Sequence, residues 1–175
     1  NHTQTWKQIK TKLKHHIQNM KHDHGCTKAM TLERLLHEQG VCPTYPVHEA
    51  LIKLVAKVDE VHALTVFKEM QEKGFFLSEG LCGMILSLCG EARHVNLAKA
   101  VQAYLRSHKM ATLATYKTLM KVYVNCGLLS AACDLYDDIL ADDIQPDNVM
   151  YGCLAKFAWK CDREDNGPSS CRNPC

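Results

Sequence analysis

The chain has 175 residues, a formal net charge of +2, ten cysteines and 7% aromatic residues. Its 46% of apolar and 23% of charged residues are typical of a globular protein and exclude disorder of the bulk of the chain. No window approaches about eighteen consecutive apolar residues, so we expect no transmembrane helix, and the near-neutral charge argues against a general polyanion binder.

The first thirty residues are strongly basic. They carry six lysines against Asp23, a sum of +5 (6 − 1), together with five histidines. Trp6, Ile9 and Leu13 begin an apolar stripe at helical spacing. The pattern predicts a basic amphipathic helix that starts within residues 1–10. Its lysines either bind phosphate groups or form the solvated face of a helix docked on the rest of the chain.

The same segment contains a possible set of metal ligands. His22, His24 and Cys26 are residue types that bind zinc, but no fourth ligand lies nearby in the sequence. We therefore expect a solvated histidine-rich loop there, with no metal and no other cofactor.

Apolar residues recur along the chain with a period of 34 or 35 residues. In residues 113–147, a stripe from Tyr116 to Tyr123 follows the pattern of an amphipathic helix, and a second stripe follows after Gly127. Pro146 closes the unit because it cannot continue a helix. Equivalent apolar positions in the first helices, spaced by 34 or 35 residues, are Ile17, Leu51, Ile85, Leu119 and Leu154. Those in the second helices are Leu36, Met70, Leu105 and Ile139.

This period predicts stacked helical hairpins, because one hairpin cannot bury its apolar stripe alone. The expected fold is all-α, a right-handed α-solenoid with one concave and one convex face, and the alternative is an irregular helical bundle. The expected units are a first repeat at 11–44, then repeats at 45–78, 79–112 and 113–147, the first helix of a fifth repeat at 148–160 and an irregular tail at 161–175.

The best-formed unit carries the residues of a known repeat. They are Ala114-Thr115-Tyr116-Lys117-Thr118-Leu119-Met120, Gly127, Ala132, Leu135-Tyr136, Ile139 and Pro146-Asp147. The unit resembles the pentatricopeptide repeat, whose pattern has a Tyr-x-x-Leu-Ile start, a glycine between its two helices and a Pro-Asp end. The resemblance covers residues 11–160. The tetratricopeptide repeat competes with it, but that repeat places a glycine and a small residue where this chain has Met120 and Ile139.

The resemblance implies an array that contacts one nucleotide of single-stranded RNA per repeat through two or three side chains. In this family the fifth and last residues of each unit read the base. In this chain those residues are His15 with Thr44, Glu49 (or His48) with Ser78, Cys82 or Gly83 with Thr112, Lys117 with Asp147, and Gly152. Only Ser78 and Asp147 match the small hydrogen-bonding residues that the family uses, and Glu49 would repel a phosphate. We therefore expect weak sequence specificity.

Two groups of charged residues suggest further contacts. Lysines expected to hold phosphates are Lys7, Lys10, Lys14 and Lys117. An acidic group in the last full repeat comprises Asp134, Asp137, Asp138, Asp142, Asp143 and Asp147. The acidic group forms either a solvated convex surface or a contact for a basic protein partner.

The cysteines and the remaining motifs indicate neither a disulfide framework nor catalysis. Most cysteines lie among apolar residues at helical spacing, and there is no Cys-x-x-Cys pair, so we expect reduced, buried thiols. A disulfide or metal clip at Cys171 and Cys175 stays open. There is no glycine-rich phosphate loop, Gly-x-Ser-x-Gly or His-Glu-x-x-His motif, so we expect a protein that is not an enzyme.

Two functions remain open from the sequence. The preferred one is an RNA-associated protein of organellar gene expression that binds single-stranded RNA on its concave face, in a mitochondrion or chloroplast, as the family resemblance implies. The alternative is a scaffold subunit of a large organellar complex, such as a mitochondrial ribosome or a bioenergetic complex, whose repeats contact other proteins.

Overall fold

Helices follow one another in a single row along the chain. The computed structural model describes residues 7–8, 11, 34, 38 and 44–165. Its continuous part, residues 44–165, contains helices and connecting turns without a strand. The helices are α3 (Tyr45–Val55), α4 (Glu60–Glu72), α5 (Glu79–Ala92), α6 (Val95–Ser107), α7 (Leu113–Asn125), α8 (Leu129–Ala141) and α9 (Asn148–Asp165).

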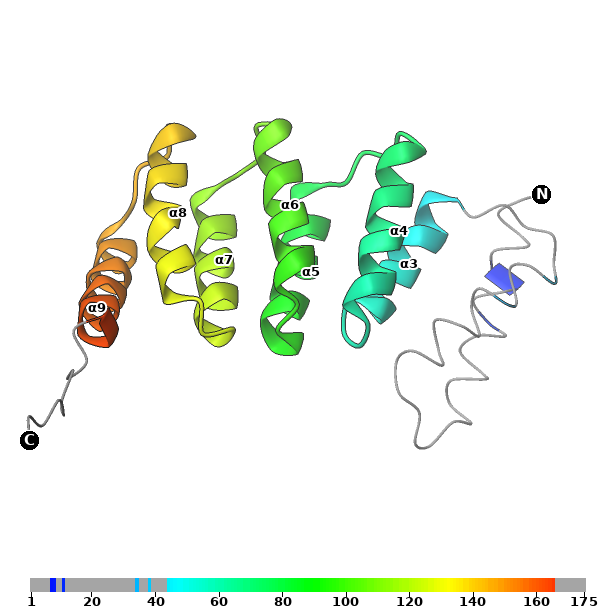
Figure 1. Cartoon of the computed structure of the whole chain (residues 1–175). Coiled ribbons are helices and arrows are strands. Elements are labelled where there is room, and N and C mark those ends of the chain that lie inside the picture. The colour runs from blue at the N-terminus through cyan, green and yellow to red at the C-terminus, as the bar shows by residue number, and fades with distance from the viewer. Residues whose placement is uncertain (1–6, 9–10, 12–33, 35–37, 39–43, 166–175) are drawn as a thin grey trace, which may run out of the picture.

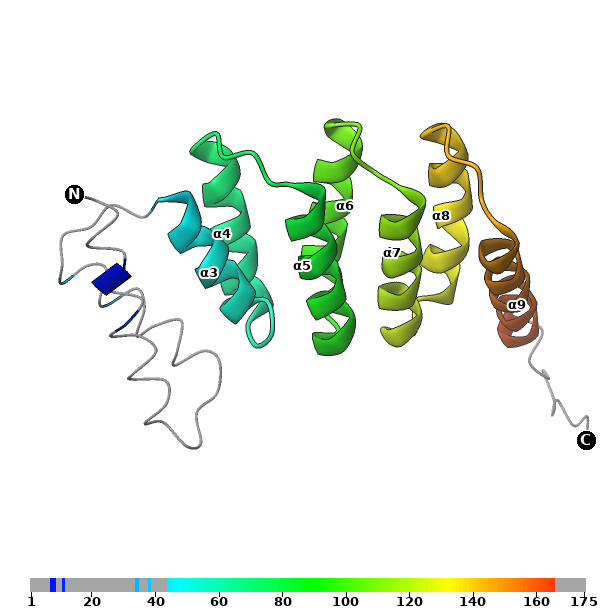
Figure 2. The same cartoon turned by 180° about the vertical axis from the view of Figure 1, so that it is seen from behind.

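The row has two layers. Helices α4, α6 and α8 lie in front in Figure 1, and α3, α5 and α7 lie in front when the molecule is turned around (Figure 2). Helix α7 packs against both α5 and α8, whereas α9 packs mainly against α8. The expected all-α solenoid is confirmed, with each element contacting its neighbours in the row.

The first helices of the hairpins are α3, α5, α7 and α9, and most of them begin at a side-chain cap. Ser78 accepts a hydrogen bond from the backbone N–H of Leu81 at 3.2 Å and caps α5. Thr112 and Thr115 form a reciprocal capping box at the start of α7. Because the first backbone N–H groups of a helix have no partner within the helix, these short polar side chains fix where each helix begins.

The second helices all end in the same way. Gly74, Lys109 and Asp143 adopt a left-handed backbone conformation just after α4, α6 and α8. The N–H of the following residue bonds back to the helix in each case, as in Met110 N–H to the Leu105 carbonyl at 2.8 Å. This is a Schellman turn, which stops the helix and turns the chain toward the next first helix.

A continuous apolar core joins the two layers from α3 to α9. Among its fully buried members are Phe67, Ile85, Leu105 and Tyr116, which come from four successive helices. These helices bury a stripe at i, i+3, i+4 and i+7, which is why the spacing in the sequence predicted them. No helix in the described part of the chain combines the length and apolarity that crossing a bilayer requires.

Several expectations fall beyond the region that the structure covers. The first helix expected within residues 1–10 and the repeat at 11–44 lie almost wholly outside the described residues, as do the histidine-rich segment and the end of the tail.

Alkylation of the cysteines should separate buried from accessible thiols. Cys82 and Cys89 are fully buried, and burial raises the pKa of their thiols to about 11 and about 12, so little thiolate forms at neutral pH. Cys133 and Cys153 are partly exposed and are not joined in a disulfide. We expect iodoacetamide at pH 8 to modify Cys133 and Cys153 in the folded protein and to modify Cys82 and Cys89 only after denaturation. Mass spectrometry of the peptides measures this order, and equal rates at all four cysteines in folded protein would contradict it.

Candidate functional site

The first helices carry one stripe of side chains that points away from the core. In α7 the buried residues include Thr115, Leu119 and Val122, whereas Lys121 and Asn125 are exposed on the opposite side. Positions four residues apart share one side of a helix, so each first helix has an equivalent stripe. We call these positions the outer stripe. Its members, all at least partly exposed, are Glu49, Lys53, Gly83, Ser87, Glu91, Lys117, Lys121, Asn125, Gly152, Lys156 and Lys160.

A groove opens on this side between α7 and α9, and we call it the α7–α9 groove. Its volume is about 270 Å³. Its apolar lining comes from both helices and comprises Met120, Val124, Val149, Met150, Cys153 and Phe157. Lys117, Lys121 and Asn125 complete the lining and supply its polar groups. Asn125 donates to the Gly90 carbonyl of α5 at 3.2 Å, which ties this rim to the neighbouring helix. The arrangement combines an apolar surface with positive charge.

An ion pair lies at the end of the groove. The Lys117 ammonium donates to the Asp147 carboxylate, and Asp147 also accepts from the backbone N–H of Met150 at 2.9 Å. The hydrogen bond from Lys117, followed by that from Met150, holds the pKa of Asp147 below its ordinary value. The resemblance predicted that Lys117 and Asp147 read a base in this unit, and in the structure these two side chains are bonded to each other.

The other candidates at the ends of the units are helix caps. Ser78 is exposed at the start of α5 and accepts from Leu81. Thr112 accepts from Thr115 and donates to a carboxylate oxygen of Glu79 at 2.8 Å. The hydroxyl of Thr112 therefore has both a donor and an acceptor role within the protein before any ligand arrives.

One candidate for RNA contact is inaccessible at the surface. Cys82 is fully buried in the core, because the third unit places Gly83, and not Cys82, on the outer stripe. The alternative residue of the second unit, His48, is buried too and bonds to the Thr44 carbonyl and to Lys73. Glu49 does lie on the outer stripe, where it pairs with Lys53 one turn later.

The remaining candidates divide between exposed and undescribed positions. Gly152 is exposed on the stripe of α9, and Lys7 is exposed in the short described stretch near the start of the chain. Lys10, Lys14 and His15 lie outside the described residues, as do the ligand types at His22, His24 and Cys26. Within the part that is described, no group of three His, Cys, Asp or Glu side chains is placed to hold a metal ion.

Half of the acidic group bonds to residues of this chain. Arg106 of α6 pairs with both Asp138 and Asp142, and Asp142 accepts a further hydrogen bond from the Tyr116 hydroxyl. Burial, and then the bond to Asp142, raises the pKa of Tyr116 above its ordinary value, so Tyr116 remains a donor. Together with Asp147, these carboxylates form hydrogen bonds and ion pairs mainly between adjacent helices. They therefore leave fewer unpaired carboxylates for a basic partner than the sequence suggested.

Sequence reasoning identified Lys117 of the outer stripe but missed the other lysines of this stripe. Lys121, Lys156 and Lys160 are exposed along α7 and α9, and Lys121 lines the α7–α9 groove. Their signal was present: Lys121 and Lys156 are one period of 35 residues apart, and Lys160 follows one turn after Lys156. They lie outside the fifth and last positions of each unit, which are the positions that the family resemblance indicates.

Comparison with known proteins identifies two family models in this region. The model described as a pentatricopeptide repeat domain matches residues 65–126, and the one described as a PPR repeat matches residues 114–144. A pentatricopeptide repeat-containing protein of Arabidopsis thaliana is 27% identical over 108 residues, which are 61% of this chain and 15% of that protein. A second, putative one from the same plant is 23% identical over 103 residues, 58% of this chain and 15% of its own length.

Solved structures show the same fold. The pentatricopeptide repeat protein PPR10 from maize superposes with a TM-score of 0.59 at 20% identity, covering 91% of this chain and 25% of PPR10. PPR10 in complex with an 18-nt psaJ RNA element gives a TM-score of 0.54 at 21% identity, over 84% of this chain and 23% of PPR10. The chain thus spans a small part of the length of each of these relatives.

Proposed function

Because the chain belongs to the pentatricopeptide repeat family, we propose that its outer stripe binds single-stranded RNA with weak sequence specificity. The observation that carries this proposal is the α7–α9 groove, whose apolar lining meets Lys117 and Lys121 at its edge. The crystal structure of PPR10 with RNA adds support from a protein of the same fold, although its likeness to this chain is a likeness of fold.

The chemistry of the groove suits a single strand and not a duplex. A strand without a partner exposes the faces of its bases, and these stack on aromatic and apolar side chains whatever the base. Val149, which is 64% exposed, and Phe157, which is partly exposed, supply such a surface. The phosphates of the same strand need cations spaced along its path, and Lys121 and Lys156 lie on adjacent first helices. A duplex hides its base faces and could use only the lysines.

The polar candidates support weak base discrimination. A base edge is read through hydrogen bonds that match its donors and acceptors. Thr112 and Asp147 already bond within the protein, and Gly83 and Gly152 have no side chain that could bond. The lysines are therefore expected to supply most of the affinity. A role in the gene expression of a mitochondrion or chloroplast is part of this proposal and follows from the family.

A salt titration tests the proposal. We expect the protein to bind a labelled single-stranded RNA of about 12 nucleotides at low salt, with fluorescence anisotropy as the readout. The logarithm of the binding constant should fall linearly with the logarithm of the salt concentration, with a slope of about −0.7 for each phosphate neutralised. The same RNA annealed to its complement is the control and should bind more weakly. No binding at low salt, or equal binding of the duplex, would contradict the proposal and favour contacts with proteins.

A further inference from the structure

A second groove lies at the end of the row, between α8 and α9, and we call it the α8–α9 groove. Its volume is about 370 Å³. Its lining comprises Cys133, Tyr136, Tyr151, Leu154, Ala155 and Ala158. It shares no residue with the α7–α9 groove, so a ligand in one of the two grooves leaves the lining of the other free.

The α8–α9 groove exposes apolar surface. The rings of Tyr136 and Tyr151 lie with their centroids 6.2 Å apart, and Tyr151 is 46% exposed. Leu140, one turn after Tyr136 on the same side of α8, is 48% exposed. Ala155 and Ala158 of α9 are exposed too, and their small side chains leave room for a helix to approach closely.

The equivalent side of α6, inside the row, has a different character. Gln102 and Arg106, which lie 34 residues before Tyr136 and Leu140, bond to carboxylates of α8. Inside the row, therefore, the covering helix brings acidic groups to a cation. At the end of the row no cation waits for them, because residues 122–155 contain neither Lys nor Arg. A helix that covers the α8–α9 groove has to match an apolar surface instead.

The groove has an acidic rim on its α8 side. Asp137 directly follows Tyr136, Asp134 lies one turn before Asp137, and both are exposed. Tyr151, then partial burial, and last the Asp137 carboxylate raise the pKa of Tyr136, so this carboxylate lies near the ring. Among the described residues, no cation pairs with Asp134 or Asp137. The groove is therefore complementary to a helix that carries an apolar stripe with positive charge beside it.

The start of this chain has the chemistry that the groove requires. The sequence predicts a helix there whose apolar stripe, in steps of three or four residues, is Trp6, Ile9, Leu13, Ile17 and Met20. Along one flank of this stripe, in steps of three, four and seven residues, follow Lys7, Lys10, Lys14 and Lys21. A helix with one basic flank matches a groove with one acidic rim, because its lysines face the carboxylates when its stripe lies in the groove.

We propose that the α8–α9 groove binds the basic segment at residues 5–21 of a second copy of this chain. The segment precedes α3, and α3 and α9 stand at opposite ends of the row, so a contact within one copy would have to span the whole row (Figure 2). The contact between copies is head to tail, and such contacts continue from copy to copy unless a ring closes. Pairing of two copies through the same groove would bring like-charged rims together, which is unfavourable.

Sedimentation velocity of the full chain tests the association. At low salt we expect the average sedimentation coefficient to rise with protein concentration, and added salt should weaken the association because it screens the exposed rim. Asp134→Asn with Asp137→Asn should weaken the association by about threefold to tenfold, the range expected for two exposed ion pairs. Glu72→Gln with Glu91→Gln is the matched control, because it removes the same charge from exposed positions on α4 and α5 and should leave the association unchanged.

A mixing experiment tests the head-to-tail geometry. Ala155→Gln with Ala158→Gln fills the groove with polar side chains at exposed positions and keeps good helix formers. Lys10→Glu with Lys14→Glu reverses the charge of the segment. Each double variant should be monomeric by itself. Their mixture should form dimers that grow no further, because one copy keeps an intact segment and the other an intact groove. Circular dichroism of each variant checks that the helices are retained.

A labelled synthetic peptide of residues 3–22 provides the second probe. It should bind the wild-type protein and should not bind the variant with the filled groove. A protein that stays monomeric at every concentration, a mixture that stays monomeric, or a peptide that does not bind would each overturn the inference, and would leave the groove to another helix. Dimers of the segment variant alone would overturn it too, since they would show pairing through the groove itself. Binding of RNA is measured separately, so the proposed function and this inference fail independently.

Discussion

Replacing Phe67 by alanine should lower the free energy of unfolding by about 3–5 kcal/mol, the range typical of a buried aromatic side chain. Phe67 is 1% exposed at the centre of α4. Its ring meets that of Tyr104 on α6 edge to face, with centroids 5.9 Å apart. The substitution removes this contact and leaves a cavity between two adjacent second helices, which the surrounding helices can fill only in part.

The loss at Phe67 should spread to the turn that follows α4. The Tyr104 hydroxyl accepts a hydrogen bond from the backbone N–H of Leu77 at 3.0 Å, just before α5 begins. Tyr104 is thus held from one side by Phe67 and itself holds the start of the next helix pair. In a row of helices that contact only their neighbours, such a shared residue couples the stability of one hairpin to the next.

Phe76→Ala is the matched control, because it makes the same chemical change nine residues later on the surface. Phe76 is 63% exposed, so its loss should change stability by less than about 0.5 kcal/mol. Urea unfolding followed by circular dichroism measures both variants. Equal destabilisation by the two variants would show that the packing of α4 against α6 is not what Phe67 supports.

The helices could be predicted from the sequence because their signals are local. The stripe from Tyr116 to Tyr123 has the period of a helix that buries one side, and Gly127 and Pro146 mark where helices cannot continue. The left-handed turns at Lys109 and Asp143 could not be predicted in this way, because neither residue is a glycine. They form because the Schellman bonds and the apolar contacts beside them outweigh the cost of that conformation.

The register of the third unit shows how little separates a core residue from a surface residue. Cys82 and Gly83 are adjacent, and neither residue type indicates whether its position on the helix is buried or exposed. The structure buries Cys82 and leaves Gly83 on the outer stripe. A shift of one residue rotates a helical position by about 100° about the axis, which is enough to exchange the two environments.

The electrostatics of the site depend on tertiary contacts that no sequence window contains. Lys117 and Asp147 are separated by 30 residues, and Arg106 and Asp138 by 32. The acidic group was visible as a run of aspartates, but its partners Arg106, Tyr116 and Lys117 come from α6 and α7. The sequence did contain the repeat period. Because Lys121 and Lys156 are one period apart, they occupy equivalent positions on the first helices α7 and α9.

The strongest test of the RNA proposal is neutralisation of the outer stripe itself. We expect the triple variant Lys121→Met, Lys156→Met and Lys160→Met to weaken binding of single-stranded RNA by about tenfold or more. Its salt slope should become shallower by about 2, since each lost phosphate contact contributes about 0.7. Methionine keeps the length and helix propensity of lysine, so the fold should be unaffected.

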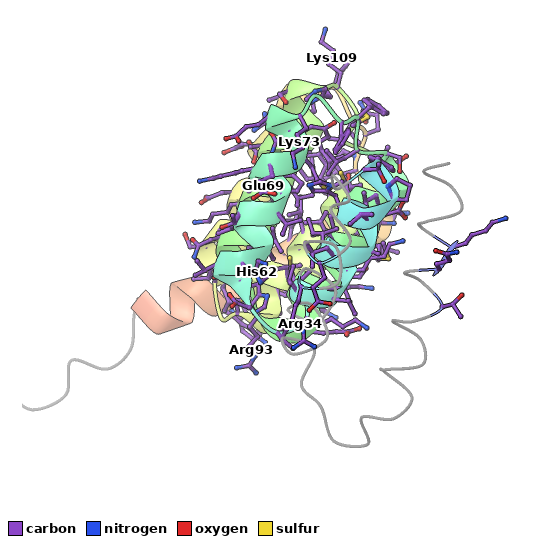
Figure 3. All side chains as sticks on the ribbon, turned by 90° about the vertical axis from the view of Figure 1, so that its right-hand side faces the viewer. Arg34, His62, Glu69, Lys73, Arg93 and Lys109 are labelled. Atoms are coloured by element: carbon purple, nitrogen blue, oxygen red, sulfur yellow. The ribbon has the colours of Figure 1, made fainter. Side chains whose placement is uncertain are left out.

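The control triple variant, Lys68→Met, Lys99→Met and Lys109→Met, removes the same charge elsewhere. Lys68 and Lys99 are exposed on the second helices α4 and α6, and Lys109 projects from the edge of the row opposite the edge that carries Arg93 (Figure 3). If RNA is held by the outer stripe, this variant should retain nearly the affinity and slope of the wild type. Equal losses in the two triple variants would instead indicate attraction by overall charge, because only a located site distinguishes lysines that carry the same charge on different faces.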